Sequence, residues 1–177
     1  LSPEEIFLEN KVYKSKKNSK TKIKVGPSES MSKSKKNVID PELMIDNYGA
    51  DAVRLFILSD SPPAKDVQWS DQGMIGSYKF IQKLWIMHNK IIDKINIEDE
   101  KGKEEDLIKY TNQLIHKFTN NIENFSYNVL IANMYETYNF LTKLNSEKIS
   151  SVALKDCYKK ILIIFSPIIP HFTSECL

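Results

Sequence analysis

A run of small hydroxyl and lysine residues near the start of the chain has the composition of a phosphate-binding loop. Residues 30–36 read Ser-Met-Ser-Lys-Ser-Lys-Lys. Ammonium groups neutralise phosphate oxygens, and hydroxyl and backbone N–H groups donate hydrogen bonds to them. The run has no hydrophobic periodicity, which predicts a loop. The candidate phosphate ligands are Ser32, Lys33, Ser34, Lys35 and Lys36. A solvated Ser/Lys linker without a ligand would have the same composition, so the surrounding segments have to distinguish the two.

The segments on either side of the loop have clear local patterns. Residues 11–14 and 21–25 alternate apolar and polar side chains and are separated by a polar stretch, the pattern of a β-hairpin. After the loop, Asp40 followed by proline predicts a helix start, and Gly49 predicts its end. Residues 51–59 predict a second helix that is apolar on nearly every side, so we expect it to be buried between other elements.

From Ser70 onward the apolar residues recur at helical spacing. Four stripes cover residues 74–95, 107–122, 130–141 and 154–165. A charged stretch at 98–105 separates the first two, Ser126 is a cap for the third, and prolines at 167 and 170 end the fourth. The residues after Pro170 begin another helix. The pattern predicts a mainly α fold, in which a small β-hairpin precedes an antiparallel helical bundle.

Composition limits the classes of protein that the chain can belong to. Of the 177 residues 41% are hydrophobic, which is enough for a core, and no apolar run is long enough to span a membrane. The N-terminal residues lack the features of a signal peptide and resemble a cut within a longer chain. Two cysteines are too few for a disulfide framework, so we expect a reducing, cytoplasmic location. Three isolated histidines are expected to be packing residues and not metal ligands: His88, His116 and His171.

Charge is distributed unevenly along the chain although the net charge is only +2. Residues 1–40 hold 10 lysines against 5 acidic residues, whereas residues 70–177 hold 13 of each sign. The excess of positive charge therefore surrounds the loop, which favours a polyanionic ligand there.

Several spaced matches resemble one family. Met-Ser-Lys-Ser-Lys at 31–35, Asn37, Asp40-Pro41, Tyr48-Gly49-Ala50-Asp51 and Arg54 resemble the second signature loop of the class I aminoacyl-tRNA synthetases and the helices that follow it. Further matches resemble the leucine-specific branch more than the isoleucine, valine or methionine branches: Ser61-Pro62-Pro63, Asp66, Trp69-Ser70-Asp71, Gly73, Gly76, Phe80 and Leu84-Trp85. The likeness is sharp from about residue 26 to residue 85. The isoleucine or valine branch is the alternative within this family.

The resemblance implies a parent enzyme that activates leucine with ATP, accompanied by Mg²⁺, and transfers it to tRNA(Leu). In this family the loop closes over ATP, and the lysine matching Lys33 is catalytic because it stabilises charge on the pyrophosphate side. The implied ATP-binding residues are Met31, Ser32, Lys33, Ser34 and Lys35, with Met31 anchoring the loop on apolar neighbours. The family pattern begins with lysine where this chain has Ser30, which puts a contribution from that position in doubt.

The resemblance also implies a division of the chain into two parts. Residues 1–69 would be the end of a Rossmann-type catalytic domain, and residues 70–177 most of a helical, anticodon-binding-like domain that contacts tRNA and is truncated at its C-terminus. Because the first half of the catalytic domain is absent, we expect the chain alone to be inactive. One flank of the first long helix is either a solvated face or a set of candidate phosphate contacts: Lys79, Lys83, Lys90 and Lys94.

Other side chains have structural interpretations. Asp51 and Arg54 are three residues apart on one helical face and could form an ion pair. Aromatic residues at helical spacing are expected in the core, although aromatic rings can also stack on bases: Trp85, Tyr127, Tyr135 and Tyr138. Two interpretations outside the enzyme family remain open. The chain could be a free-standing RNA-binding helical module, which predicts salt-sensitive RNA binding by the chain alone, or a structural adaptor with an unrelated linker.

Overall fold

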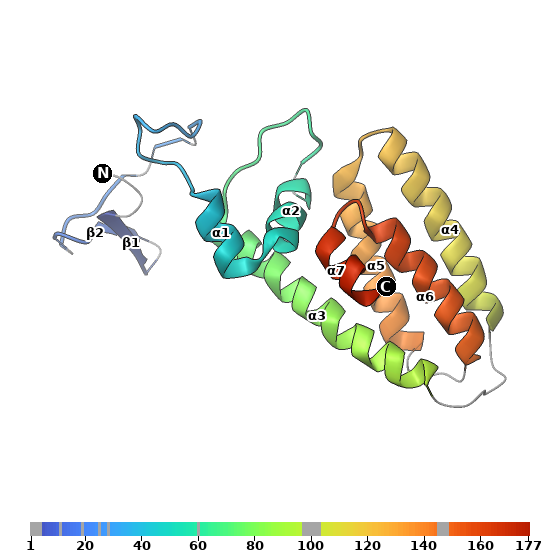
Figure 1. Cartoon of the computed structure of the whole chain (residues 1–177). Coiled ribbons are helices and arrows are strands. Elements are labelled where there is room, and N and C mark those ends of the chain that lie inside the picture. The colour runs from blue at the N-terminus through green and yellow to red at the C-terminus, as the bar shows by residue number, and fades with distance from the viewer. Residues whose placement is uncertain are drawn as a thin grey trace. The chain divides into compact units, whose positions relative to one another are not determined.

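Helices account for most of the chain, as the sequence predicts, in the computed structural model of the protein (Figure 1). The structure describes residues 5–10, 12–18, 20–24, 26–27, 29–59, 61–96, 104–144 and 149–177. In these ranges lie two short strands and helices α1 to α7. The chain divides into two compact units, Leu1–Met44 and Ile45–Leu177.

The first unit contains a two-stranded antiparallel sheet. Strand β1 (Ile6–Glu9) pairs with β2 (Val12–Ser15), with Ile6 opposite Ser15. The small hairpin that the sequence predicts is therefore present, and the mainly α fold class is confirmed.

The partner strand of this hairpin differs from the prediction. A strand near residues 11–14 is correct, but its predicted pairing with residues 21–25 is present only in part. An antiparallel bridge, Lys14 opposite Lys22, and a hydrogen bond from the Ile23 N–H to the Tyr13 carbonyl at 2.8 Å link the two segments, whereas the ladder of β2 is formed with β1. Asn10 lies in the short connection between β1 and β2 and has a φ of +50°. Tight hairpin turns require such a left-handed backbone, and Asn tolerates it. This turn brings the preceding residues against β2, so the closer segment in sequence forms the ladder.

Helix α1 (Pro41–Tyr48) begins and ends where its capping residues predict. The Oδ1 atom of Asp40 accepts the Glu42 N–H at 3.0 Å. At the other end Gly49 has a φ of +80° and donates its N–H to the Ile45 carbonyl at 2.8 Å, as a C-terminal glycine does. Both predicted boundaries are confirmed.

In the second unit, helix α2 (Ala50–Ser59) packs against the N-terminal part of helix α3 (Asp71–Ile95). Gly73 of α3 allows the close approach, because a Cβ atom there would lie 2.7 Å from the Phe56 ring of α2. The expectation that α2 is buried on nearly every side is wrong in part. Its core side is buried, whereas Ile57 is 48% exposed on the opposite side.

Helices α4 (Glu104–Glu123), α5 (Tyr127–Leu144) and α6 (Ser151–Phe165) complete the predicted bundle with α3. Helix α4 packs against both α5 and α6, while α3 contacts α5 and α6 (Figure 1). The short helix α7 (Pro170–Cys176) packs on α2, α3 and α6. Residues 98–103 of the predicted connector at 98–105 lie outside the described residues. The predicted end of the connector is wrong, because Glu104 and Glu105 already form the first turn of α4.

Stacked aromatic rings join the helices of the bundle. Phe118 of α4 lies over Phe165 of α6 with ring centroids 5.5 Å apart, and Tyr110 of α4 stacks on Phe140 of α5 at 3.8 Å. Such pairs add to the burial of apolar area. They hold α4 against both of its neighbours.

Helix α2 belongs to the same compact unit as the bundle, because it contacts α3, α5 and α7. The functional division after residue 69 that the resemblance implies stays a prediction. None of the helices in the described ranges has the length and apolar character needed to cross a bilayer.

Candidate functional site

The Ser/Lys loop of the first unit folds as a tight turn. The N–H groups of Lys35 and Lys36 donate to the carbonyls of Ser32 and Lys33, each at 3.2 Å. The Ser32 hydroxyl also accepts the Lys35 N–H at 3.3 Å and lies 3.2 Å from the Ser34 hydroxyl. The two serines therefore help to shape the turn from which the three lysines project.

The side chain of Asn37 closes this turn. Its Oδ1 accepts the Ser32 N–H at 2.8 Å, and its Nδ2 donates to the Ser30 carbonyl at 3.4 Å. Asn37 is one of the residues that match the family, and the sequence alone predicts no role for it. An Asn directly after a polar loop is a recognisable signal, since its amide can satisfy both a backbone donor and a backbone acceptor.

The lysines of the loop differ in their electrostatic partners. Lys35 Nζ lies 2.7 Å from Glu29 Oε2, and this ammonium lowers the pKa of the Glu29 carboxyl through a hydrogen bond and its charge. Lys33 and Lys36 are exposed, and within the described part of the chain neither ammonium has a side-chain partner. The Lys33 ammonium is therefore accessible from solvent and not engaged by a carboxylate of the described residues.

The loop begins with Ser30 and Met31. Met31 is 47% exposed, so the expected anchoring of this side chain on apolar neighbours is wrong for this chain. Ser30 contributes its carbonyl to Asn37 and supplies no positive charge where the family has a lysine. The ATP-binding and catalytic roles of residues 31–35 stay predictions.

The four lysines expected on α3 separate into two groups. Lys79, Lys83 and Lys90 are exposed and lie within about 40° of one another around the helix, given 3.6 residues per turn. Lys94 is partly buried and donates to the Leu144 carbonyl of α5 at 3.2 Å. Because a cation at the C-terminal end of a helix is stabilising, Lys94 has a structural role in the bundle.

A shallow cavity of about 140 Å³ adjoins the exposed lysines at the seam between α3 and α5. Lys83 and Lys90 line its α3 side, and Tyr138 and Thr142 line its α5 side. The only acidic residue of α5, Glu136, pairs with Lys117 of α4 at 3.8 Å. The residues that line the cavity therefore include two lysines and no acidic residue, although the bundle as a whole is balanced in charge.

The bundle aromatics are mixed in their exposure. Tyr135 stacks on Phe80 at 3.8 Å but is 41% exposed, and Trp85 is 43% exposed beside His88. The expectation that Trp85 lies in the core is wrong, because Leu84 occupies the buried position of that turn.

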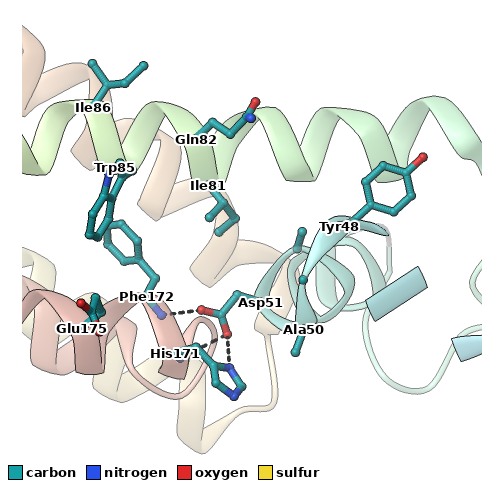
Figure 2. Close-up of a pocket in the computed structure, with 12 residues that line it drawn as sticks. Tyr48, Ala50, Asp51, Ile81, Gln82, Trp85, Ile86, His171, Phe172 and Glu175 are labelled. Carbon is teal, nitrogen blue, oxygen red and sulfur yellow. Dashed lines mark hydrogen bonds and ion pairs between the residues drawn. The ribbon is translucent and has the colours of Figure 1, made fainter. Parts of the chain in front are cut away.

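Asp51 and Arg54 do not form the ion pair that their spacing suggests. Asp51 is buried, and its carboxylate accepts the N–H groups of His171 at 3.3 Å and Phe172 at 2.6 Å and contacts His171 Nδ1 at 2.9 Å (Figure 2). Arg54 instead donates to the carbonyls of Pro167 at 2.7 Å and of residue 168 at 3.1 Å. Both charged side chains therefore form hydrogen bonds with backbone groups between the end of α6 and the start of α7. Backbone groups at helix ends lack partners within the helix, and these two side chains supply them.

Each histidine has a local partner. His88 is buried with Nδ1 3.0 Å from the Tyr158 hydroxyl, and burial lowers the pKa of its imidazole. His171 bonds to Asp51, and His116 Nε2 lies 3.1 Å from the Asn120 amide. In the ranges that the structure describes, His, Cys, Asp and Glu side chains form no group of three that could hold a metal ion.

Two family models match separate parts of the chain. Residues 19–70 match the family described as tRNA synthetases class I (I, L, M and V), and residues 104–177 match the anticodon-binding domain of tRNA ligase. The first match includes the whole Ser/Lys loop, and the second begins at the first residue of α4.

Curated relatives match over nearly the whole chain. A leucine–tRNA ligase of Bartonella henselae is 36% identical over 99% of this chain and 21% of its own length, and one of Rickettsia bellii is 39% identical over the same shares. One of Orientia tsutsugamushi is 41% identical over 86% of the chain and 18% of its own length. The chain therefore spans about a fifth of the relatives that it matches.

A solved structure supports the fold. The agnB2 LeuRS of Agrobacterium radiobacter K84, crystallised as a ternary complex with tRNA and LeuAMS, superposes with a TM-score of 0.73 over 82% of this chain and 20% of that one. The sequence identity is 24%, so this likeness is informative about the fold. The helical architecture is shared.

Proposed function

Because the chain belongs to the leucine–tRNA ligase family of class I tRNA synthetases, we propose that it forms the part of such a ligase that carries the ATP-phosphate loop and a tRNA-binding helical bundle. The complete ligase would activate leucine with ATP and transfer it to tRNA(Leu). The names of the relatives favour leucine over isoleucine or valine. We place the protein in the cytoplasm, where tRNA is charged.

The proposed ATP role rests on the exposure and the ion-pair partners of the lysines in the loop. The turn at 32–36 is held by its own hydrogen bonds and by Asn37, and Lys33 leaves it exposed and without an ion-pair partner in the described residues. Lys35, in contrast, is already paired with Glu29. A positioned ammonium can stabilise the charge that develops on the pyrophosphate side when the leucine carboxylate attacks the α-phosphorus. Lys33 is therefore the catalytic candidate.

The loop does not have the ligands of a magnesium site. Mg²⁺ takes carboxylate and carbonyl oxygens in octahedral geometry, whereas this loop projects ammonium and hydroxyl groups, and its nearest acid, Glu29, is paired with Lys35. Residues 29–37 thus do not fit a resident Mg²⁺. The loop residues would act on ATP directly through positive charge and N–H donors.

The Lys33 role is tested by leucine-dependent ATP–pyrophosphate exchange in the complete ligase. Lys33→Ala should slow exchange by about 10²–10³-fold, the usual effect of removing one oxyanion-type donor. Lys24→Ala is the matched control, because Lys24 is an exposed lysine of the same unit outside the loop, and it should leave exchange nearly unchanged. Exchange by Lys33→Ala that equals that of the control would disprove the assignment.

We also propose that the seam between α3 and α5 contacts the tRNA backbone. Lys79, Lys83 and Lys90 supply positive charge along one flank, and the hydroxyls of Tyr138 and Thr142 lie across the seam. Lysines that neutralise phosphates release counterions, so the contact should weaken with salt. Lys94 is left out of this surface, because its ammonium bonds to the end of α5.

This surface is tested by tRNA binding to the complete ligase at several salt concentrations. A Lys83→Ala/Lys90→Ala variant should bind tRNA more weakly, and the slope of log affinity against log salt should fall by about 2, one for each lost phosphate contact. Lys155→Ala/Lys159→Ala on α6 removes the same charge from two exposed lysines away from the seam and should change neither quantity. Equal effects of the two variants would contradict the seam.

The part played by each segment follows from this proposal. Residues 1–69 would form the end of the catalytic domain and residues 70–177 the tRNA-binding bundle, a division that agrees with the separate family matches at 19–70 and 104–177. Because the chain covers about a fifth of its relatives, we expect it to need the remaining polypeptide for adenylate formation. Leucine-dependent exchange by residues 1–177 alone would contradict that expectation.

A further inference from the structure

A hydrophobic groove in the second unit takes no part in the proposed ATP or tRNA contacts. Its volume is about 710 Å³, and it lies between the start of α2, the middle of α3 and α7 (Figure 2). The residues that define it are Tyr48, Ile81, Trp85, Ile86, Phe172 and Glu175. Figure 2 shows Trp85 and Phe172 side by side on one side of the groove and Tyr48 on the other, with Ile81 between them.

The walls of the groove offer apolar surface and few free polar groups. Trp85 is 43% exposed and Ile86 is 56% exposed. Asp51, the buried carboxylate at the groove, already accepts the N–H groups at the start of α7. A contiguous apolar hollow of this size on a folded surface marks a site where another apolar group binds.

We propose that this groove is the docking site for an apolar segment of the same ligase polypeptide from outside residues 1–177. The relatives are about five times as long as this chain, so in a complete ligase most of the polypeptide lies outside these residues. A covalently linked segment has an effective concentration in the millimolar range, which favours it over a free partner. The inference rests on family membership and is independent of the proposed catalytic role of Lys33.

The chemistry of the groove describes the segment that would fit. The groove beside Trp85 and Phe172 suits one or two large apolar side chains, which would cover the exposed surfaces of Trp85 and Ile86. Glu175 is an exposed acid on the rim, so a lysine or arginine beside the apolar side chains would complete the contact.

The groove is tested by thiol labelling at its edge, read peptide by peptide by mass spectrometry. Gln82→Cys places a thiol on an exposed, groove-lining position of α3, and Gln113→Cys on α4 is the matched control on an exposed helix position away from the groove. Each variant is made in residues 1–177 and in the complete ligase. In the shorter chain both thiols should react at similar rates. In the complete ligase the thiol of Q82C should react more slowly by about tenfold or more, while that of Q113C keeps its rate.

Two results would overturn the proposal. One is equal labelling of Q82C in the two proteins, which would mean that the groove stays open in the complete ligase. The other is slow labelling already in residues 1–177, which would assign the groove to another part of the same 177 residues if the chain is a monomer by light scattering, or to a second copy if it is a dimer. If the proposal is correct, a photo-crosslinker at position 82 of the complete ligase should crosslink to peptides of the same polypeptide outside residues 1–177. Leucine charging is assayed separately, so a failure of the catalytic proposal leaves the labelling result unaffected.

Discussion

The Asp51 carboxylate accepts the backbone N–H of Phe172 at 2.6 Å, although the two residues are 121 positions apart. Helix α7 starts with Pro170, and its N-cap residue, Ile169, makes no side-chain capping bond. Asp51 of α2 therefore supplies the acceptor that the first turn of α7 lacks, and it also accepts the His171 N–H. A residue in the stretch that matches the class I synthetases thus holds the last helix of the chain.

Asp51→Ala should lower the free energy of unfolding by about 2–3 kcal/mol, because it leaves buried backbone donors without a charged acceptor. Asp51→Asn should cost less, since the amide oxygen can still accept one bond. Urea unfolding measures both, and Asp46→Ala on the exposed side of α1 is the control. Equal midpoints for Asp51→Ala and Asp46→Ala would contradict the capping role.

Two glycines of α3 should respond to alanine in opposite directions. Gly73→Ala places a Cβ atom 2.7 Å from the Phe56 ring, which should cost about 1–3 kcal/mol through overpacking between α2 and α3. Gly76→Ala meets nothing within 4 Å and should stabilise the helix by about 1 kcal/mol through propensity. The difference is measured by urea unfolding. A stabilising Gly73→Ala would show that the helices do not approach so closely.

Phe125 has a left-handed backbone, with a φ of +53°, and its side chain is 63% exposed. It follows α4 as the residue of a C-terminal turn in which the Ser126 N–H donates to the Asn121 carbonyl at 2.8 Å, a position that favours glycine. Phe125→Gly should stabilise the protein by up to about 1 kcal/mol, because it removes the steric cost of φ > 0. Thermal unfolding measures this, with Phe125→Ala as the variant that keeps the cost. A melting temperature for Phe125→Gly at or below that of Phe125→Ala would argue against it.

The buried His88 should make the protein less stable in mild acid. Burial lowers the pKa of its imidazole below the ordinary value of 6.5, so the unfolded state binds a proton more readily than the folded state. Its contribution to stability is complete above pH 6.5 and is lost as the pH falls from 6.5 toward the lowered pKa. Melting temperatures at pH 7.5 and 5.5 test this. His88→Gln should show a smaller drop between these pH values than the native chain, and an equal drop would contradict the assignment.

Elements with strong local signals were predictable from the sequence. The boundaries of α1 follow from Asp40, Pro41 and Gly49, because capping depends on residues within one turn of the helix end. The long stripes of the bundle also gave the right helices. The main sheet partner of β2 was not predicted, since alternation alone did not identify the turn at Asn10 that brings β1 against β2.

For both the loop and the lysines of α3, the sequence predicted the candidate residues but not which of their charges are already paired. The residue types of the loop made Lys33, Lys35 and Lys36 equal candidates for phosphate binding. The structure distinguishes Lys35 from the other two, because Lys35 forms an ion pair with Glu29. That ion pair depends on how the turn folds, so the sequence alone did not reveal it. On α3, spacing placed four lysines on one flank. Helical geometry alone could not reveal that Lys94 reaches the end of α5.

By itself the sequence determined the family, the helical segments of the bundle, the boundaries of α1 and the presence of a basic loop, because each depends on residue types at short spacing. The tertiary structure decided which groups the charged side chains bind. Asp51 and Arg54 are three residues apart and could have formed an ion pair, yet each binds backbone groups near α7 more than 110 residues away. Packing brings those unpaired N–H and carbonyl groups to α2, and a buried backbone group without a partner costs more than an exposed ion pair contributes.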